Sequence, residues 1–141
     1  MNTAGPGTPF SGLGPGSWEQ GVYDYRALPL PGSRVFQDHH AVASWSYDHQ
    51  KNEMISFDNE AVAAMKGQWI REHGLGGSMF WELSGDKGPD RKEMEGGHGK
   101  EPVPGMSLVK VVKDAMGPLD KSPNWLRYER SQFDNLKNCT I

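Results

Sequence analysis

The residues best suited to chemistry stand together in the stretch GLGGSMFWELSGD, residues 74–86. Trp81 is the second of two adjacent aromatic residues. The carboxylate of Glu82 follows it directly, and that of Asp86 follows within the same stretch. Many α/β barrels present such residues at the carboxyl end of a strand, where they line a site. The sequence therefore predicts a buried strand over Gly77–Leu83 with a candidate site at its carboxyl end.

Two other groups of residues have side chains that can bind metals, but neither has the spacing of a metal site. His39 and His40 are adjacent, so on a strand edge they face opposite ways, and His49 brings no acidic partner at ligand spacing. The second group is acidic and lacks the spacing of an EF-hand loop: Asp86, Asp90 and Glu93. We therefore expect no metal site and no cofactor.

A helix is predicted directly before the candidate site. Asp58 or Asn59 can serve as its N-cap, and Gly74 can end it as the C′ glycine. Its inner face is predicted from apolar residues at helical spacing, which makes Trp69 a core residue. That face comprises Val62, Met65, Trp69 and Ile70.

Three further segments are predicted around this helix. The alternation in His40–Tyr47 and the apolar run Met54–Phe57 indicate a hairpin with a loop of roughly five residues. Trp18–Leu28 is compatible with a short strand or a helical turn. Ser107 can cap a second helix, which Gly117 ends. Its predicted inner face consists of Leu108, Val111, Val112 and Ala115.

The composition indicates one domain with a small core. The chain has 141 residues, a net charge of −3 and no basic patch, so we expect no nucleic-acid partner. Hydrophobic residues make up 35%, and 18 glycines with 10 prolines make up about a fifth of the chain. No apolar run approaches the ~18 residues of a membrane span, and the N-terminus does not read as a signal peptide. Cys139, the single cysteine, allows neither an intrachain disulfide nor a cysteine metal site.

The predicted order of helix, strand and helix is that of a βα-repeat fold, but the chain is too short to complete one. A parallel strand that is buried on both faces needs neighbours on both edges, and only one such strand is predicted. A complete eight-fold barrel needs about 250 residues. We therefore expect the chain to be the last part of a larger α/β barrel.

Four blocks of sequence carry a resemblance to a known family. They are GSWEQGVYDYRALP (Gly16–Pro29), ASWSYD (Ala43–Asp48), MISFDNEAVAAMKGQWIREHGLGGSMFWELSGD (Met54–Asp86) and SQFDNLKN (Ser131–Asn138). In this order they resemble the C-terminal part of fungal chitinases of glycoside hydrolase family 18. The most specific block is 58–86, and only the charged loop 87–105 falls outside the resemblance.

The resemblance implies a fold class. Members of the family have a (β/α)₈ TIM barrel with a small α+β insertion after the seventh strand. On that basis 1–57 is the latter part of the α+β insertion, and 58–117 holds barrel helix 7, strand 8 and helix 8. Residues 118–141 are a C-terminal extension.

The resemblance also implies site residues and a ligand. Trp81 matches the strand-eight tryptophan that lies under the sugar ring at the cleavage subsite. Glu19, in the Ser-Trp-Glu motif, matches a residue that hydrogen-bonds sugar. Trp18 and Trp45 are interpreted as packing residues, and Phe80 is expected on the opposite face from Trp81, toward the helices. The implied partners are chitin or chito-oligosaccharides, and no protein partner is implied.

The family's catalytic signature, Asp-Gly-x-Asp-x-Asp-Trp-Glu, is matched nowhere in the sequence. In this family the substrate's N-acetyl oxygen attacks the anomeric carbon, a glutamic acid protonates the leaving oxygen, and an aspartate orients the acetamido group. We therefore assign no catalytic residue and expect the isolated chain to be inactive. Two alternatives remain open: a non-catalytic remnant that binds chitin, and a chain that neither folds nor functions.

The family implies that the full-length parent is extracellular. The sequence Asn138-Cys139-Thr140 is an N-glycosylation acceptor, which suits a secreted parent. Because no signal peptide is recognised in this chain, we expect it to come from a truncated gene model, a degraded gene or a late start of that parent.

Overall fold

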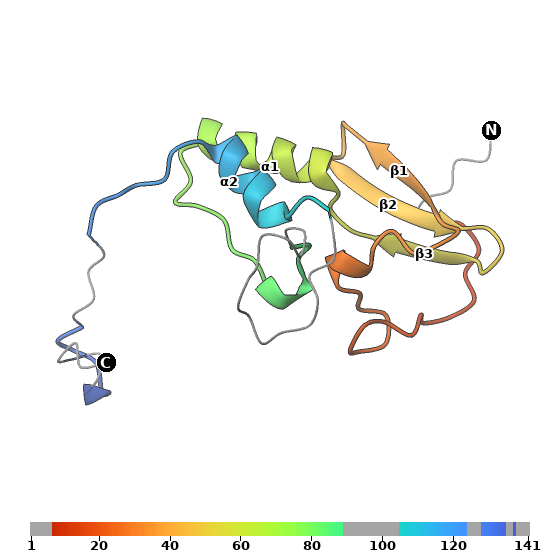
Figure 1. The fold of residues 1–141 in the computed structure, drawn as a ribbon, viewed down its shortest axis with the longest axis horizontal. Coiled ribbons are helices and arrows are strands. Elements are labelled where there is room, and N and C mark those ends of the chain that lie inside the picture. The colour runs from red at the N-terminus through yellow and green to blue at the C-terminus, as the bar shows by residue number, and fades with distance from the viewer. Residues whose placement is uncertain (1–6, 89–104, 124–127, 135–136, 138–141) are drawn as a thin grey trace.

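The fold is a small antiparallel sheet that lies beside a pair of packed helices (Figure 1). The structure is a computed structural model, which describes residues 7–88, 105–123, 128–134 and 137. The strands are β1 (Arg34–Asp38), β2 (Ala43–Asp48) and β3 (Glu53–Ser56), and the helices are α1 (Glu60–Glu72) and α2 (Leu108–Met116). Two short 3₁₀ turns, Tyr25–Ala27 and Leu83–Gly85, complete these elements.

The sheet has the order β1-β2-β3, and both of its pairings are antiparallel. Trp45 of β2 lies opposite Phe36 of β1 and Ser56 of β3. The Trp45 and Phe36 rings are stacked, with centroids 6.0 Å apart. The predicted hairpin is therefore confirmed as β2 and β3, and so is the packing role of Trp45. Strand β1 was not predicted.

The turn that joins β2 to β3 is held by Asp48. Its Oδ1 atom accepts hydrogen bonds from the backbone N–H groups of Gln50, at 2.8 Å, and Lys51, at 3.1 Å. These bonds, the one from Lys51 first, lower the pKa of the Asp48 carboxyl below its usual value near 3.8. The charged form of Asp48 is therefore the one that fits the folded state.

We expect the turn to weaken in acid because of this lowered pKa. The contribution of Asp48 is fully present above the unfolded pKa of about 4 and is lost as the pH falls through the lower folded-state pKa. The fall in thermal midpoint between pH 6 and pH 3 should therefore be smaller in Asp48→Asn, which keeps an acceptor but cannot titrate. Equal falls in both proteins would contradict this.

Both predicted helices are confirmed, together with their caps. The side chain of Asn59 accepts a hydrogen bond from Val62 N at 3.0 Å and begins α1. Ser107 begins α2 by accepting from Lys110 N at 3.0 Å. Gly74 and Gly117 follow the two helices with positive φ angles of 62° and 87°, which glycine adopts at low cost.

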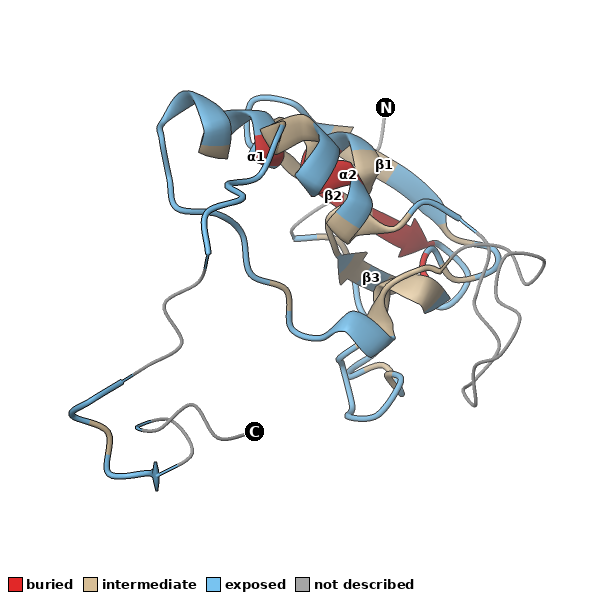
Figure 2. Ribbon diagram, turned by 60° about the vertical axis from the view of Figure 1, so that its left-hand side comes forward, coloured by how far each residue is buried: buried red, intermediate tan, exposed pale blue. Residues whose placement is uncertain are grey.

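The two helices meet through small residues and valines. Ala63 of α1 forms a buried cluster with Val111 and Val112 of α2, as predicted for the α2 face (Figure 2). At Gly67 the two helices approach closely, because a Cβ there would lie 2.8 Å from Ala115 Cβ and 2.9 Å from the Val112 carbonyl oxygen.

The prediction that Trp69 is a core residue is wrong. Its side chain remains 52% exposed and stacks on His73, with ring centroids 4.1 Å apart. The helix turns the stripe that contains Val62, Ala63 and Gly67 inward instead. Ala63 and Gly67 are small enough to let the helix backbones approach closely, and the bulky indole cannot occupy the same interface.

Substituting Gly67 by alanine should destabilise the chain. Alanine has the higher helix propensity by about 1 kcal/mol, but its Cβ meets backbone and Cβ atoms that cannot rotate away. Overpacking of this kind costs typically 1–3 kcal/mol, so we expect a net loss of about 1 kcal/mol in denaturant unfolding. Gly76→Ala is the matched control, because nothing lies within 4 Å of its added Cβ. Equal stability of the two variants would refute the close contact.

The predicted buried strand over Gly77–Leu83 is also wrong for this structure. The segment is irregular before the 3₁₀ turn at Leu83–Gly85, and Met79 is strongly exposed. Within the described residues no strand lies beside it, and a strand buried on both faces requires partners on both edges. The barrel assignment and the boundaries at 57 and 117 therefore stay predictions, while the described part is a small α+β unit.

Several sequence-based interpretations fall outside the described residues: those on Asp90, Glu93, Cys139 and most of the loop 87–105. Among the residues that are described, no helix is long and apolar enough to cross a membrane. Nor does any group of three His, Cys, Asp or Glu side chains within that part converge on a possible metal position.

Candidate functional site

A cleft lies where two segments that are distant in sequence face each other. One segment runs from Trp18 to Tyr25 and the other from Phe80 to Asp86, and Leu108 and Val109 at the start of α2 complete the lining. The cleft has a volume of about 490 Å³. Small-molecule sites are typically about 300–1,000 Å³, so this cleft is large enough for a ligand such as a sugar.

Trp81 and Phe80 are adjacent but have different surroundings: Trp81 is exposed at the cleft, and Phe80 packs against the helices. Trp81 lines the cleft and is 91% exposed, so its indole face is open to a ligand. Phe80 is half-buried and packs against the Ala63, Val111 and Val112 cluster. This confirms that Phe80 points toward the helices.

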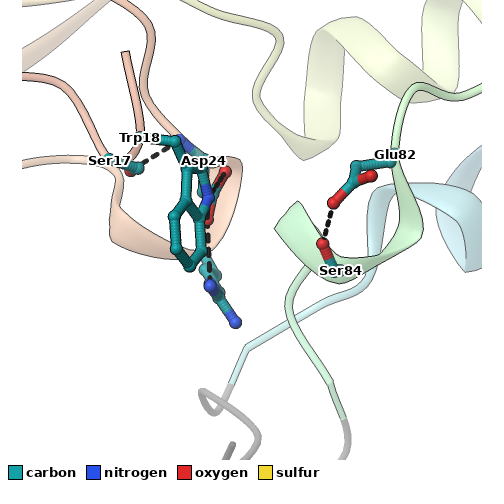
Figure 3. A network of polar contacts seen from close by, with 6 residues as sticks. Ser17, Trp18, Asp24, Glu82 and Ser84 are labelled. Atoms are coloured by element: carbon teal, nitrogen blue, oxygen red, sulfur yellow. Dashed lines mark hydrogen bonds and ion pairs between the residues drawn. The ribbon is translucent and has the colours of Figure 1, made fainter. Parts of the chain in front are cut away.

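Glu82 follows Trp81 across a cis peptide bond and is exposed at the same cleft. The hydroxyl of Ser84 donates a hydrogen bond to its carboxylate (Figure 3). The carboxylate is thereby held on the wall formed by the second segment, and it has oxygen lone pairs to offer a ligand hydroxyl.

Asp86, in contrast, is structural. Its Oδ1 accepts from the backbone N–H of Leu108 and of Lys87, each at 2.9 Å. Its Oδ2 accepts from Ser107 Oγ at 2.6 Å and from Val109 N at 3.3 Å. The carboxylate therefore joins the cleft segment to the N-terminus of α2, where backbone donors and the helix dipole favour a negative charge. This role could not be predicted from the sequence, because Ser107 stands 21 residues away.

Tyr25 forms part of the floor of the cleft. Its hydroxyl is buried without a hydrogen bond to any described residue, and Lys87 Nζ lies 4.3 Å from the ring centroid. Burial, and then the nearby carboxylate of Glu60, raise the pKa of Tyr25. Tyr25 therefore stays neutral at ordinary pH.

The two residues predicted to bind sugar are not equally placed. Trp81 lines the cleft. Glu19 is exposed and is not part of the cleft lining, whereas Trp18, the residue before it, is. The interpretation of Trp18 as a packing residue does not match its 68% exposure. The sugar-binding roles of Trp81 and Glu19 remain predictions.

Comparisons with known proteins agree on one family. The profile described as glycosyl hydrolases family 18 matches residues 2–86. Chitinase 1 of Aphanocladium album is 40% identical over 138 residues, which cover 97% of this chain and 29% of the relative. Endochitinase 1 of Metarhizium robertsii is 39% identical with the same coverage. The chain thus spans less than a third of the length of these relatives.

A solved structure extends the likeness to three dimensions. Chitinase ChiA74 from Bacillus thuringiensis matches with a TM-score of 0.59 and 27% identity, over 76% of this chain and 18% of that one. The profile match covers more than half of the chain, including the whole Trp18–Tyr25 segment and both Trp81 and Glu82. The chain therefore belongs to glycosyl hydrolase family 18.

Proposed function

We propose that this chain forms part of the substrate cleft of a family 18 chitinase and binds chitin or chito-oligosaccharides. The observation that carries the proposal is the exposed indole of Trp81 in a cleft of about 490 Å³. A pyranose ring presents a face of C–H groups, which suits stacking on an aromatic ring. The printed names of the relatives, Chitinase 1 and Endochitinase 1, support the same substrate class.

We further propose that the hydrolytic activity belongs to the longer parent protein and not to this chain alone. The parent would cleave the β-1,4 linkages of N-acetylglucosamine polymers with a general acid from the signature that this sequence lacks. General acid–base catalysis typically contributes 10²–10⁴-fold, so its loss should leave the chain without measurable cleavage. Because chitin is too large to enter a cell, the parent would act outside it.

Retention on chitin tests the binding proposal. The purified chain should be retained on insoluble chitin more strongly than on cellulose, which lacks the acetamido groups. Trp81→Ala should abolish most of that retention. Trp69→Ala is the matched control, because Trp69 is also exposed but lies outside the cleft.

The same incubation tests the catalytic part, since no soluble sugar should be released. Equal retention of Trp81→Ala and the unmodified chain would refute the binding proposal. Release of chito-oligosaccharides by the purified chain would refute the assignment of catalysis to the longer parent.

A further inference from the structure

The loop that carries Trp18 is fixed by its own backbone. Ser17 N donates to Val22 O at 2.8 Å, and Val22 N donates to Glu19 O at 3.1 Å. Gly16 has a φ of 69°, and a Cβ there would lie only 1.8 Å from Glu19 O. The loop therefore closes tightly over Gly16 and places the backbone of Trp18 at the cleft.

Asp24 anchors the indole of Trp18 from behind. Trp18 Nε1 donates to the two carboxylate oxygens of Asp24 at 3.1 and 3.0 Å, as Figure 3 shows. Arg26 holds the same carboxylate with an Nε hydrogen bond of 3.1 Å and an ion pair of 3.0 Å. The backbone N–H of Asp24 donates to Ser17 Oγ at 2.9 Å.

The surroundings of Asp24 keep this arrangement rigid. Its side chain is only 14% exposed. A Cβ at Gly85 would lie 3.3 Å from Asp24 Oδ1, so the second segment of the cleft packs directly against the anchor. The indole N–H is thus engaged within the protein, while the ring as a whole remains 68% exposed at the cleft.

We infer that Trp18 is a second aromatic platform for the sugar chain and that Asp24 is its positioning residue. The inference rests on the proposed function, because it takes the ligand to be a chito-oligosaccharide. A chain of pyranose rings offers several C–H faces, and two tryptophans on opposing segments of one cleft can each contact a different part of it. An aromatic ring that is already held in place loses little side-chain entropy when the ligand binds.

The indole N–H signals of the full chain provide the test. In the tryptophan-labelled protein, Trp18 is assigned as the signal missing from Trp18→Phe, and Trp81 likewise from Trp81→Phe. On titration with hexa-N-acetylchitohexaose, both signals should shift with the same concentration dependence. Trp18→Ala should weaken binding about 3- to 10-fold. Trp18→Phe, which keeps an aromatic face but loses the N–H that donates to Asp24, should recover only part of that loss.

A double-mutant cycle separates positioning from general structural effects. Asp24→Ala should weaken binding in the unmodified chain but not in the Trp18→Ala background, because the anchor acts only through the indole. Asp24→Asn keeps one acceptor for the indole N–H, so its affinity should lie between those of the unmodified chain and Asp24→Ala. This milder variant keeps the test valid if Asp24→Ala does not fold.

Three results would overturn the inference. If the Trp81 signal shifts to saturation while the Trp18 signal stays still, Trp18 is not a platform, although the proposed function stands. If neither signal moves, the inference and the proposed function fail together. An equal effect of Asp24→Ala in both backgrounds would show that Asp24 does not act through Trp18.

Discussion

Replacing Trp81 by alanine is expected to weaken the binding of a soluble chito-oligosaccharide by about 10- to 30-fold. Residues that dominate a binding site are often tryptophans, and truncating them costs about 2 kcal/mol or more. A difference of 1.4 kcal/mol corresponds to a factor of ten, so a loss of about 2 kcal/mol lies in this range. Calorimetric titration with hexa-N-acetylchitohexaose measures the effect directly.

Two controls make this result specific to the ring. Trp81→Phe keeps a smaller aromatic face and should lose less affinity than Trp81→Ala. Because Trp81 is 91% exposed, both variants should unfold within about 0.5 kcal/mol of the unmodified chain. Unchanged affinity in a folded Trp81→Ala protein would refute the role of Trp81 as a sugar platform.

Replacing Asp86 by alanine is expected to have the largest effect on stability, a loss of about 2–3 kcal/mol. The change removes a carboxylate that accepts from Lys87 N, Leu108 N, Val109 N and Ser107 Oγ. Loss of a capping side chain alone costs about 0.5–2 kcal/mol, and hydrogen bonds to charged groups are worth about 1.5–3 kcal/mol each. The expected loss is smaller than the sum of these terms, because water can hydrogen-bond part of the backbone N–H groups that Asp86 leaves at the N-terminus of α2.

Denaturant unfolding of three variants tests this account of Asp86. Asp86→Asn keeps an acceptor oxygen and should lose less stability than Asp86→Ala. Asp114→Ala is the matched control, since Asp114 lies on the exposed face of the same helix, where it pairs with Lys110 and Lys113. If Asp86→Ala and Asp114→Ala were equally stable, Asp86 would not be the residue that ties the cleft to α2.

The parts of the fold that could be predicted are those determined by neighbouring residues. The side chain of Asn59 caps α1 within one turn, and Ser107 does the same for α2. The hairpin is likewise local, because β2 and β3 are joined by a short turn that Asp48 holds. In each case the residues that determine the structure lie within a few positions of it.

The parts that could not be predicted depend on contacts across the chain. Strand β1 is half exposed and has no clean alternation, so only its pairing with β2 reveals it. Helical spacing is compatible with either of two adjacent stripes of α1 facing inward. The close approach of α2 at Gly67 turns the Gly67 stripe inward and leaves Trp69 exposed. The segment 77–83 needs neighbouring strands that the described part does not supply.

The candidate site shows the same division. Trp81 was found from the aromatic–acidic pattern and the family resemblance, and it lines the cleft. Asp86 was grouped with it by sequence, but its hydrogen bonds belong to α2. Asp24 was missed because its role depends on its contacts with Trp18 and Gly85, and these contacts are known only from the fold.

The central claim is that a chito-oligosaccharide lies against Trp81 in the cleft between residues 18–25 and 80–86. Intermolecular nuclear Overhauser effects between the sugar and the labelled chain test it most directly. We expect contacts from the pyranose C–H protons to the indole ring of Trp81. Contacts confined to Trp69 and His73, or none at saturating sugar, would contradict it.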